Sequence, residues 1–171
     1  ALANGVSVLT ARPHLLGERF VLTMADHVID ESVMTLAGDR ARCLADATAT
    51  LLVDYKLDTI FDMADATKVL ADDGDPRRIL RIGKQITDYN CVDCGVFICT
   101  TALMDALQQV LDVEGDTSLS DGVQALSARG GMHVLDIGDG FWQDVDTPEM
   151  LAHAERVLSS EGAETSRGPN A

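Results

Sequence analysis

Acidic residues at two places in the chain could hold a metal ion. Asp26 follows an apolar run at residues 20–25, and Asp144 and Asp146 lie two positions apart in an extended segment before the last predicted helix. A carboxylate at the end of a buried strand is costly unless a cation or hydrogen-bond donors meet it. We therefore expect Asp26 and Asp144 to share one divalent metal ion. The alternative is that Asp26 is a turn residue and that Asp146 or Thr147 simply caps the helix.

Basic residues gather in one short stretch of an otherwise acidic chain. Five of the 13 lysines and arginines lie there: Lys68, Arg77, Arg78, Arg81 and Lys84. A local positive patch attracts a phosphorylated small molecule, whereas the alternative for Arg77 and Arg78 is a solvated hairpin edge protected by charge. Lys84 differs because it follows Gly83 at the close of a predicted strand, so we expect its ammonium group to meet a phosphate.

The composition excludes several classes of protein. The 171 residues include 28 Asp plus Glu against 13 Lys plus Arg, and the resulting formal net charge of -15 repels nucleic acid and phosphate-rich membranes. No apolar run approaches the roughly 18 to 20 residues of a membrane span, and the N-terminus lacks the features of a signal peptide. We expect one domain in a soluble, cytoplasmic protein.

Cys91 and Cys94 have the CxxC spacing of zinc and redox sites. No second such pair and no HxxxH partner accompanies them, and a redox motif would open a helix, whereas this pair lies in a strand-like run. We expect these two residues and Cys99 to be buried free thiols.

Turn signals and apolar periodicity predict an α/β fold. The run at residues 20–25 has the pattern of a fully buried strand, so we expect it in the centre of the sheet with helices on both faces. Asp30 is expected to cap a helix over residues 31–36, with Gly38 just past the end of this helix. The other predicted elements are strands at 48–55, 92–99 and 132–137, a hairpin of 66–71 with 78–82, and helices at 102–111, 118–128 and from Pro148 to about 158.

Five motifs together resemble the sugar-phosphate nucleotidyltransferases, with the inositol-1-phosphate cytidylyltransferase branch the most similar. They are, in chain order, ERFVLTMADHVID, DATKV, RIGKQITDYNCVDCGVFICT, SLSDGVQALSARGGM and GDGFWQDVDTPEML. The resemblance extends from about Asn4 to Leu158. It implies a mixed, mostly parallel sheet flanked by helices, and transfer of a nucleotidyl group from a nucleoside triphosphate to a sugar phosphate or inositol phosphate with release of pyrophosphate.

The resemblance also assigns roles to residues and to a cofactor. The family's Mg²⁺-binding acids correspond to Asp26 and Asp144, with Asp146 as a further candidate. The lysine that contacts the sugar phosphate corresponds to Lys84, and the glycine against which the sugar packs corresponds to Gly95. Asn90 and Asp93 are expected to reach sugar hydroxyls.

One part of the family fold has no counterpart among these 171 residues, namely the first βαβ portion with its catalytic lysine and the GxGxR loop that holds the triphosphate. We therefore expect a partial nucleotidyltransferase domain over residues 1–158, with a disordered tail at 159–171. Two interpretations stay open: an enzyme fragment that is inactive without an N-terminal segment, or a non-catalytic module that binds sugar phosphates for regulation or assembly. Either leaves one sheet edge bare, which predicts low stability and association into a homo-oligomer.

Overall fold

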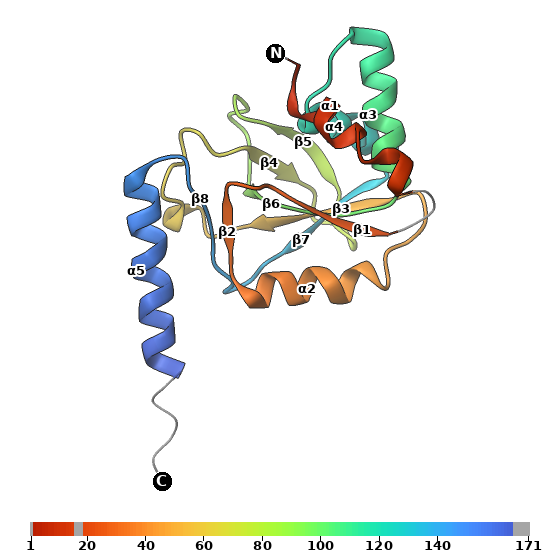
Figure 1. Cartoon of the computed structure of the whole chain (residues 1–171). Helices are drawn as coiled ribbons and strands as arrows, with labels where there is room; N and C mark the ends of the chain where they lie inside the picture. Colours follow the sequence, from red (N-terminus) through yellow and green to blue (C-terminus); the bar gives the residue numbers. More distant parts are fainter. Residues whose placement is uncertain (1, 16–18, 166–171) are drawn as a thin grey trace.

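The computed structural model describes residues 2–15 and 19–165 and shows helices packed around a mixed β-sheet (Figure 1). The strands are β1 (Phe20–Thr23), β2 (His27–Ile29), β3 (Ala49–Asp54), β4 (Lys68–Ala71), β5 (Ile79–Gly83), β6 (Cys91–Cys99), β7 (Met132–Asp136) and β8 (Trp142–Asp144). The helices are α1 (Asn4–Leu9), α2 (Glu31–Ala41), α3 (Thr101–Glu114), α4 (Leu119–Ser127) and α5 (Pro148–Thr165), with short 3-10 turns at Arg12–His14 and Leu57–Thr59.

The main sheet has six strands, ordered β5-β4-β6-β3-β7, and β1 pairs with β6 beside β4. β3 and β7 are parallel, whereas β6 is antiparallel to β1, β3 and β4. Consequently β1, β3, β4 and β7 all run in one direction and only β5 and β6 oppose them. The predicted mixed and mostly parallel sheet is therefore confirmed. β2 and β8 form a separate two-stranded ribbon.

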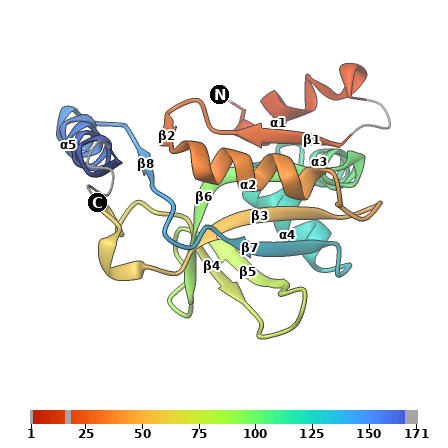
Figure 2. The ribbon, with the colours of Figure 1, turned by 90° about the horizontal axis from the view of Figure 1, so that it is seen from below.

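Strand β6 divides the core because its side chains alternate between the two faces. Cys91, Phe97 and Cys99 pack with α3 and α4, whereas Val92 and Val96 pack with α2. Figure 2 shows α2 on one side of the sheet and α4 on the other. Because Asp93 and Gly95 alternate with the α2-facing residues, they lie on the face that carries α3 and α4.

The prediction that residues 20–25 form a central, fully buried strand was wrong. Among the described residues β1 pairs only with β6, its residues 20–22 are half-buried and Thr23 is exposed. The apolar run instead faces a groove of about 460 Å³ that lies between β1 and α1. The physical reason is that an apolar run indicates only that its side chains lie in apolar surroundings. It does not specify which strands pair with the two edges of the strand. In the described part of the chain, the other edge of β1 is unpaired.

Most local predictions are confirmed. The Asp30 side chain accepts a hydrogen bond from the Val33 amide and caps α2, although this helix continues past Gly38 to Ala41. The predicted hairpin is β4 with β5. The three cysteines of β6 are buried free thiols, and Cys43 is an exposed one.

The C-terminal helix extends further than expected. α5 reaches Thr165, so residues 159–165 of the predicted tail are helical, and the rest of that tail lies outside the described residues. Figure 1 shows α5 beyond β8, at the side of the sheet. In the described part of the chain, no helix is both long and apolar enough to span a membrane.

Candidate functional site

The ribbon of β2 and β8 brings the two predicted metal-binding segments together. His27 is opposite Asp144 in the ribbon register, and the Val145 amide donates a hydrogen bond of 2.8 Å to the Asp26 carbonyl oxygen. These backbone bonds place the end of β1 beside the end of β8. Asp26 and Asp144 are therefore neighbours along the backbone, although they are far apart in the sequence. Among the described residues, the carboxylate cluster that could hold a metal ion contains Asp144 but not Asp26.

A cavity of about 180 Å³ opens at this point, and we call it the acidic cavity. Six of the seven predicted site residues line it: Asp26, Lys84, Asp93, Gly95, Asp144 and Asp146. Asn90 does not line it, because its side-chain amide makes two hydrogen bonds of 2.9 Å to the backbone of Ala71 and so ties β4 to β6. Its predicted contact with sugar hydroxyls has no support from this geometry.

Asp65, which was not among the predicted site residues, also lines the acidic cavity. Carboxylate oxygens of Asp65, Asp144 and Asp146 lie within 4.8 Å of one another, and both oxygens of Asp65 are 2.8 Å from the Lys84 ammonium. An all-oxygen donor set of this kind suits Mg²⁺. Asp65 precedes β4 in a loop with several acids, so neither periodicity nor spacing distinguishes it.

Of the five basic residues in the predicted patch, only Lys84 lines the acidic cavity. Arg78 pairs with Asp72, and Arg81 pairs with Asp88. The Lys68 side chain is buried, and its ammonium donates to the carbonyl oxygens of residues 64, 66 and 84 at 3.1 to 3.4 Å. The ammonium of Lys68 therefore fastens the loop that carries Asp65 and does not offer its charge to a ligand.

The carboxyl groups of the acidic cavity differ in their electrostatic surroundings. The hydrogen bond from the His27 ring lowers the pKa of Asp26. Burial raises the pKa of Asp144, and it raises the pKa of Asp93 to about 6 even though that carboxylate accepts a 2.7 Å hydrogen bond from the Gly95 amide. The cavity therefore combines a readily ionised acid with two that hold their protons more tightly.

Gly95 has a structural reason to lack a side chain. Its φ is +73°, and a Cβ atom there would lie 2.5 Å from the His27 ring. The glycine therefore makes room for His27, in addition to the sugar-packing role that the resemblance implies.

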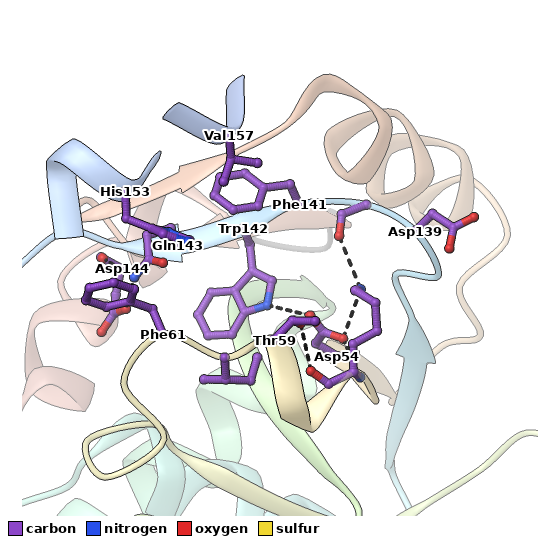
Figure 3. Close-up of a pocket in the computed structure, with 13 residues that line it drawn as sticks. Asp54, Thr59, Phe61, Asp139, Phe141, Trp142, Gln143, Asp144, His153 and Val157 are labelled. Carbon is purple, nitrogen blue, oxygen red and sulfur yellow. Dashed lines mark hydrogen bonds and ion pairs between the residues drawn. The ribbon is translucent and has the colours of Figure 1, made fainter. Parts of the chain in front are cut away.

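A second cavity, of about 250 Å³, shares Trp142 and Asp144 with the acidic cavity (Figure 3). We call it the aromatic cavity because Phe61, Phe141, Trp142 and His153 line it. This cavity was not predicted from the sequence, since its walls come from β8, α5 and the segment after β3. Its position makes Trp142 a shared wall of the two cavities.

Comparisons with known proteins agree with this architecture. No family model matches the chain. Among solved structures, a putative glucose-1-phosphate thymidylyltransferase from Bacillus anthracis superposes with a TM-score of 0.70 at 13% identity, covering 90% of this chain and 59% of that one. The inositol-1-phosphate CTP transferase from T. maritima superposes with a TM-score of 0.75 at 28% identity, covering 92% and 62%. The fold is therefore that of the nucleotide-diphospho-sugar transferases.

Relatives in sequence indicate which branch of these transferases the chain resembles. Two proteins named bifunctional IPC transferase and DIPP synthase are 35% identical, from Rubrobacter xylanophilus, and 32% identical, from Archaeoglobus fulgidus. The matches cover 97% and 92% of this chain but 36% and 28% of those proteins, so the chain spans about a third of their length. These relatives and the T. maritima structure support the NTP transferase family, close to the inositol-phosphate cytidylyltransferase branch, as the motifs of the chain predicted.

Proposed function

We propose that this chain forms the acceptor and metal-binding part of a Mg²⁺-dependent nucleotidyltransferase, which transfers a nucleotidyl group from a nucleoside triphosphate to an inositol phosphate or sugar phosphate and releases pyrophosphate. The observation that carries the proposal is the acidic cavity, where the end of β1, the end of β8 and Lys84 converge. Its oxygen-rich wall suits a divalent cation, and its single lining lysine suits a phosphate.

Asp65, Asp144 and Asp146 would hold the Mg²⁺ ion with their clustered carboxylate oxygens. Asp26, which lines the same cavity outside that cluster, would complete the coordination of the ion. The ion would neutralise phosphate charge and thereby stabilise the charge that develops during transfer. Lys84 would bind the acceptor phosphate, which must compete with Asp65 for the ammonium group. Asp93 is placed to accept a hydrogen bond from a hydroxyl group of the acceptor.

Binding of inositol 1-phosphate tests the acceptor assignment. Calorimetric titration of the 171-residue chain with Mg²⁺ present should show weak, salt-sensitive binding, because the exposed Lys84 ammonium is screened by salt. Lys84→Met should abolish the binding. Arg42→Met is a matched control, since Arg42 also forms an exposed ion pair, with Asp39, but does not line the acidic cavity. Equal loss in both variants would refute the assignment of Lys84.

Pyrophosphate release tests the catalytic assignment. The family's GxGxR loop is not among these residues, so we infer that residues 1–171 alone release no pyrophosphate from any nucleoside triphosphate offered with inositol 1-phosphate or sugar 1-phosphates. In a protein that joins this chain to a GxGxR segment, release should appear and Asp144→Asn should reduce it strongly, while Glu114→Gln on the exposed end of α3 should not. Acceptor binding without any release in the joined protein would instead favour a non-catalytic binding module.

A further inference from the structure

A buried carboxylate lies behind Trp142. The Asp54 side chain is 4% exposed, and one of its oxygens accepts a 3.1 Å hydrogen bond from the indole N–H (Figure 3). Its other oxygen accepts hydrogen bonds from the amide and the ammonium of Lys56, at 2.7 and 2.9 Å. The same ammonium donates to the Gly138 and Gly140 carbonyl oxygens, which lie just before β8. Asp54 therefore anchors the indole ring to β3.

The indole ring of Trp142 in turn stacks against the imidazole ring of His27. The two rings are stacked with their centroids 5.6 Å apart and their planes 20° from parallel. Gly95 borders the imidazole closely, since a Cβ atom at that position would lie 2.5 Å from His27 Cδ2. The imidazole thus lies between a stacked ring and the backbone of β6, and its side chain is only 14% exposed. Little freedom is left to this ring.

His27 holds one oxygen of Asp26. Its Nδ1 atom is 2.9 Å from Asp26 Oδ1, while the Asp26 side chain is 57% exposed and has no other side-chain partner among the described residues. An exposed aspartate without such a bond samples several rotamers. The imidazole contact therefore decides which way the carboxylate points.

We propose that Asp54, Trp142 and His27 are positioning residues that fix the orientation of the Asp26 carboxylate at the acidic cavity. The inference rests on the proposed function in assigning a metal ion to Asp26. Desolvating a carboxylate is costly, so a buried Asp54 needs compensating partners, and the indole and Lys56 supply them. Asp54 does not line the acidic cavity, and the hydrogen bond from the Trp142 indole is its direct link to a residue that does.

We call the contacts from Asp54 through Trp142 and His27 to Asp26 the positioning relay. The affinity of the full chain for Mn²⁺ tests it, with free Mn²⁺ measured by electron paramagnetic resonance. Asp54→Asn should weaken binding about tenfold, the usual cost of losing a residue that orients a metal ligand. Asp139→Asn is the matched control: it removes the same charge from the same aromatic cavity without a hydrogen bond to Trp142. Equal effects of the two substitutions would show that charge alone is responsible and would overturn the proposal.

A double-mutant cycle separates the relay from general destabilisation. If Asp54 acts through the indole, adding Asp54→Asn to Trp142→Phe should weaken Mn²⁺ binding no further than Trp142→Phe alone. Additive losses would refute transmission through Trp142. The fraction of folded protein is checked by circular dichroism under the same conditions.

A readout without metal keeps the two proposals distinguishable. Trp142 is the only tryptophan in the chain, so its indole N–H gives a single NMR cross-peak that reports directly on the Asp54 bond. In the metal-free chain, Asp54→Asn should shift this peak, the His27 ring nitrogens and the Asp26 carboxylate carbon, whereas Asp139→Asn should not. If the wild-type chain binds no Mn²⁺ but these shifts occur, the metal assignment fails and the positioning relay stands. Unchanged His27 and Asp26 signals overturn the relay itself.

Discussion

Replacing Asp93 by asparagine should change how the stability of the chain depends on pH. Burial raises the pKa of this carboxyl group to about 6 from an ordinary value of 3.8. The folded state therefore binds the proton more tightly than the unfolded chain does. The contribution of Asp93 to stability is complete below about pH 4 and is lost as the pH rises through about 6.

The magnitude follows from the difference between the two pKa values. At about 1.36 kcal/mol per pKa unit, the shift from 3.8 to about 6 corresponds to about 3 kcal/mol in total, of which the wild-type chain should lose about 2 kcal/mol between pH 4 and pH 7. An asparagine side chain would carry no charge to desolvate, and its amide oxygen could still accept the hydrogen bond that Asp93 takes from the Gly95 amide. Asp93→Asn should therefore become more stable relative to wild type, by up to that amount, across this range.

Urea unfolding in EDTA from pH 4 to pH 7.5 measures the effect without a bound metal ion. Asp58→Asn serves as the control because Asp58 is an exposed aspartate of the short turn after β3. The difference in unfolding free energy between wild type and Asp93→Asn should grow with pH, while the difference for the control should stay nearly constant. A pH-independent difference for Asp93→Asn would refute the assigned desolvation of this carboxyl.

Three further substitutions test the surroundings of the cavity. Gly95→Ala should destabilise the chain by about 2 kcal/mol or more in urea unfolding, because φ is +73° and the new methyl group overlaps His27; an unchanged midpoint would contradict the geometry. Lys68→Met should cost about 2 kcal/mol in the same assay, since it leaves three backbone carbonyl oxygens without their donor, and a neutral result would mean that water replaces the ammonium. Asp65→Asn should tighten binding of inorganic phosphate in ³¹P NMR titrations by releasing Lys84, and weaker binding would show that the pair supports the phosphate site.

The local elements of this protein and most of its cavity residues could be predicted from short stretches of sequence. Helix α2 begins directly after Asp30 because the Asp30 carboxylate accepts a hydrogen bond from the Val33 amide. A contact between residues three positions apart can be recognised in the sequence. Asp26 was identifiable because the apolar run at 20–25 changes abruptly to acidic and polar residues, and Asp144 because it lies two positions from Asp146 in an extended segment before a helix.

Which of these elements meet depends on long-range contacts that local patterns do not encode. The edge position of β1 depends on its pairing with β6 alone, which its own apolar pattern does not specify. Asp65 joins the acidic cavity because the buried Lys68 ammonium fastens its loop. Asp54 reaches Trp142 because the end of β3 lies close to β8. Each of these contacts joins segments that come together only in the folded chain, and their free energy comes from desolvation and hydrogen bonding that exist only after the sheet has formed.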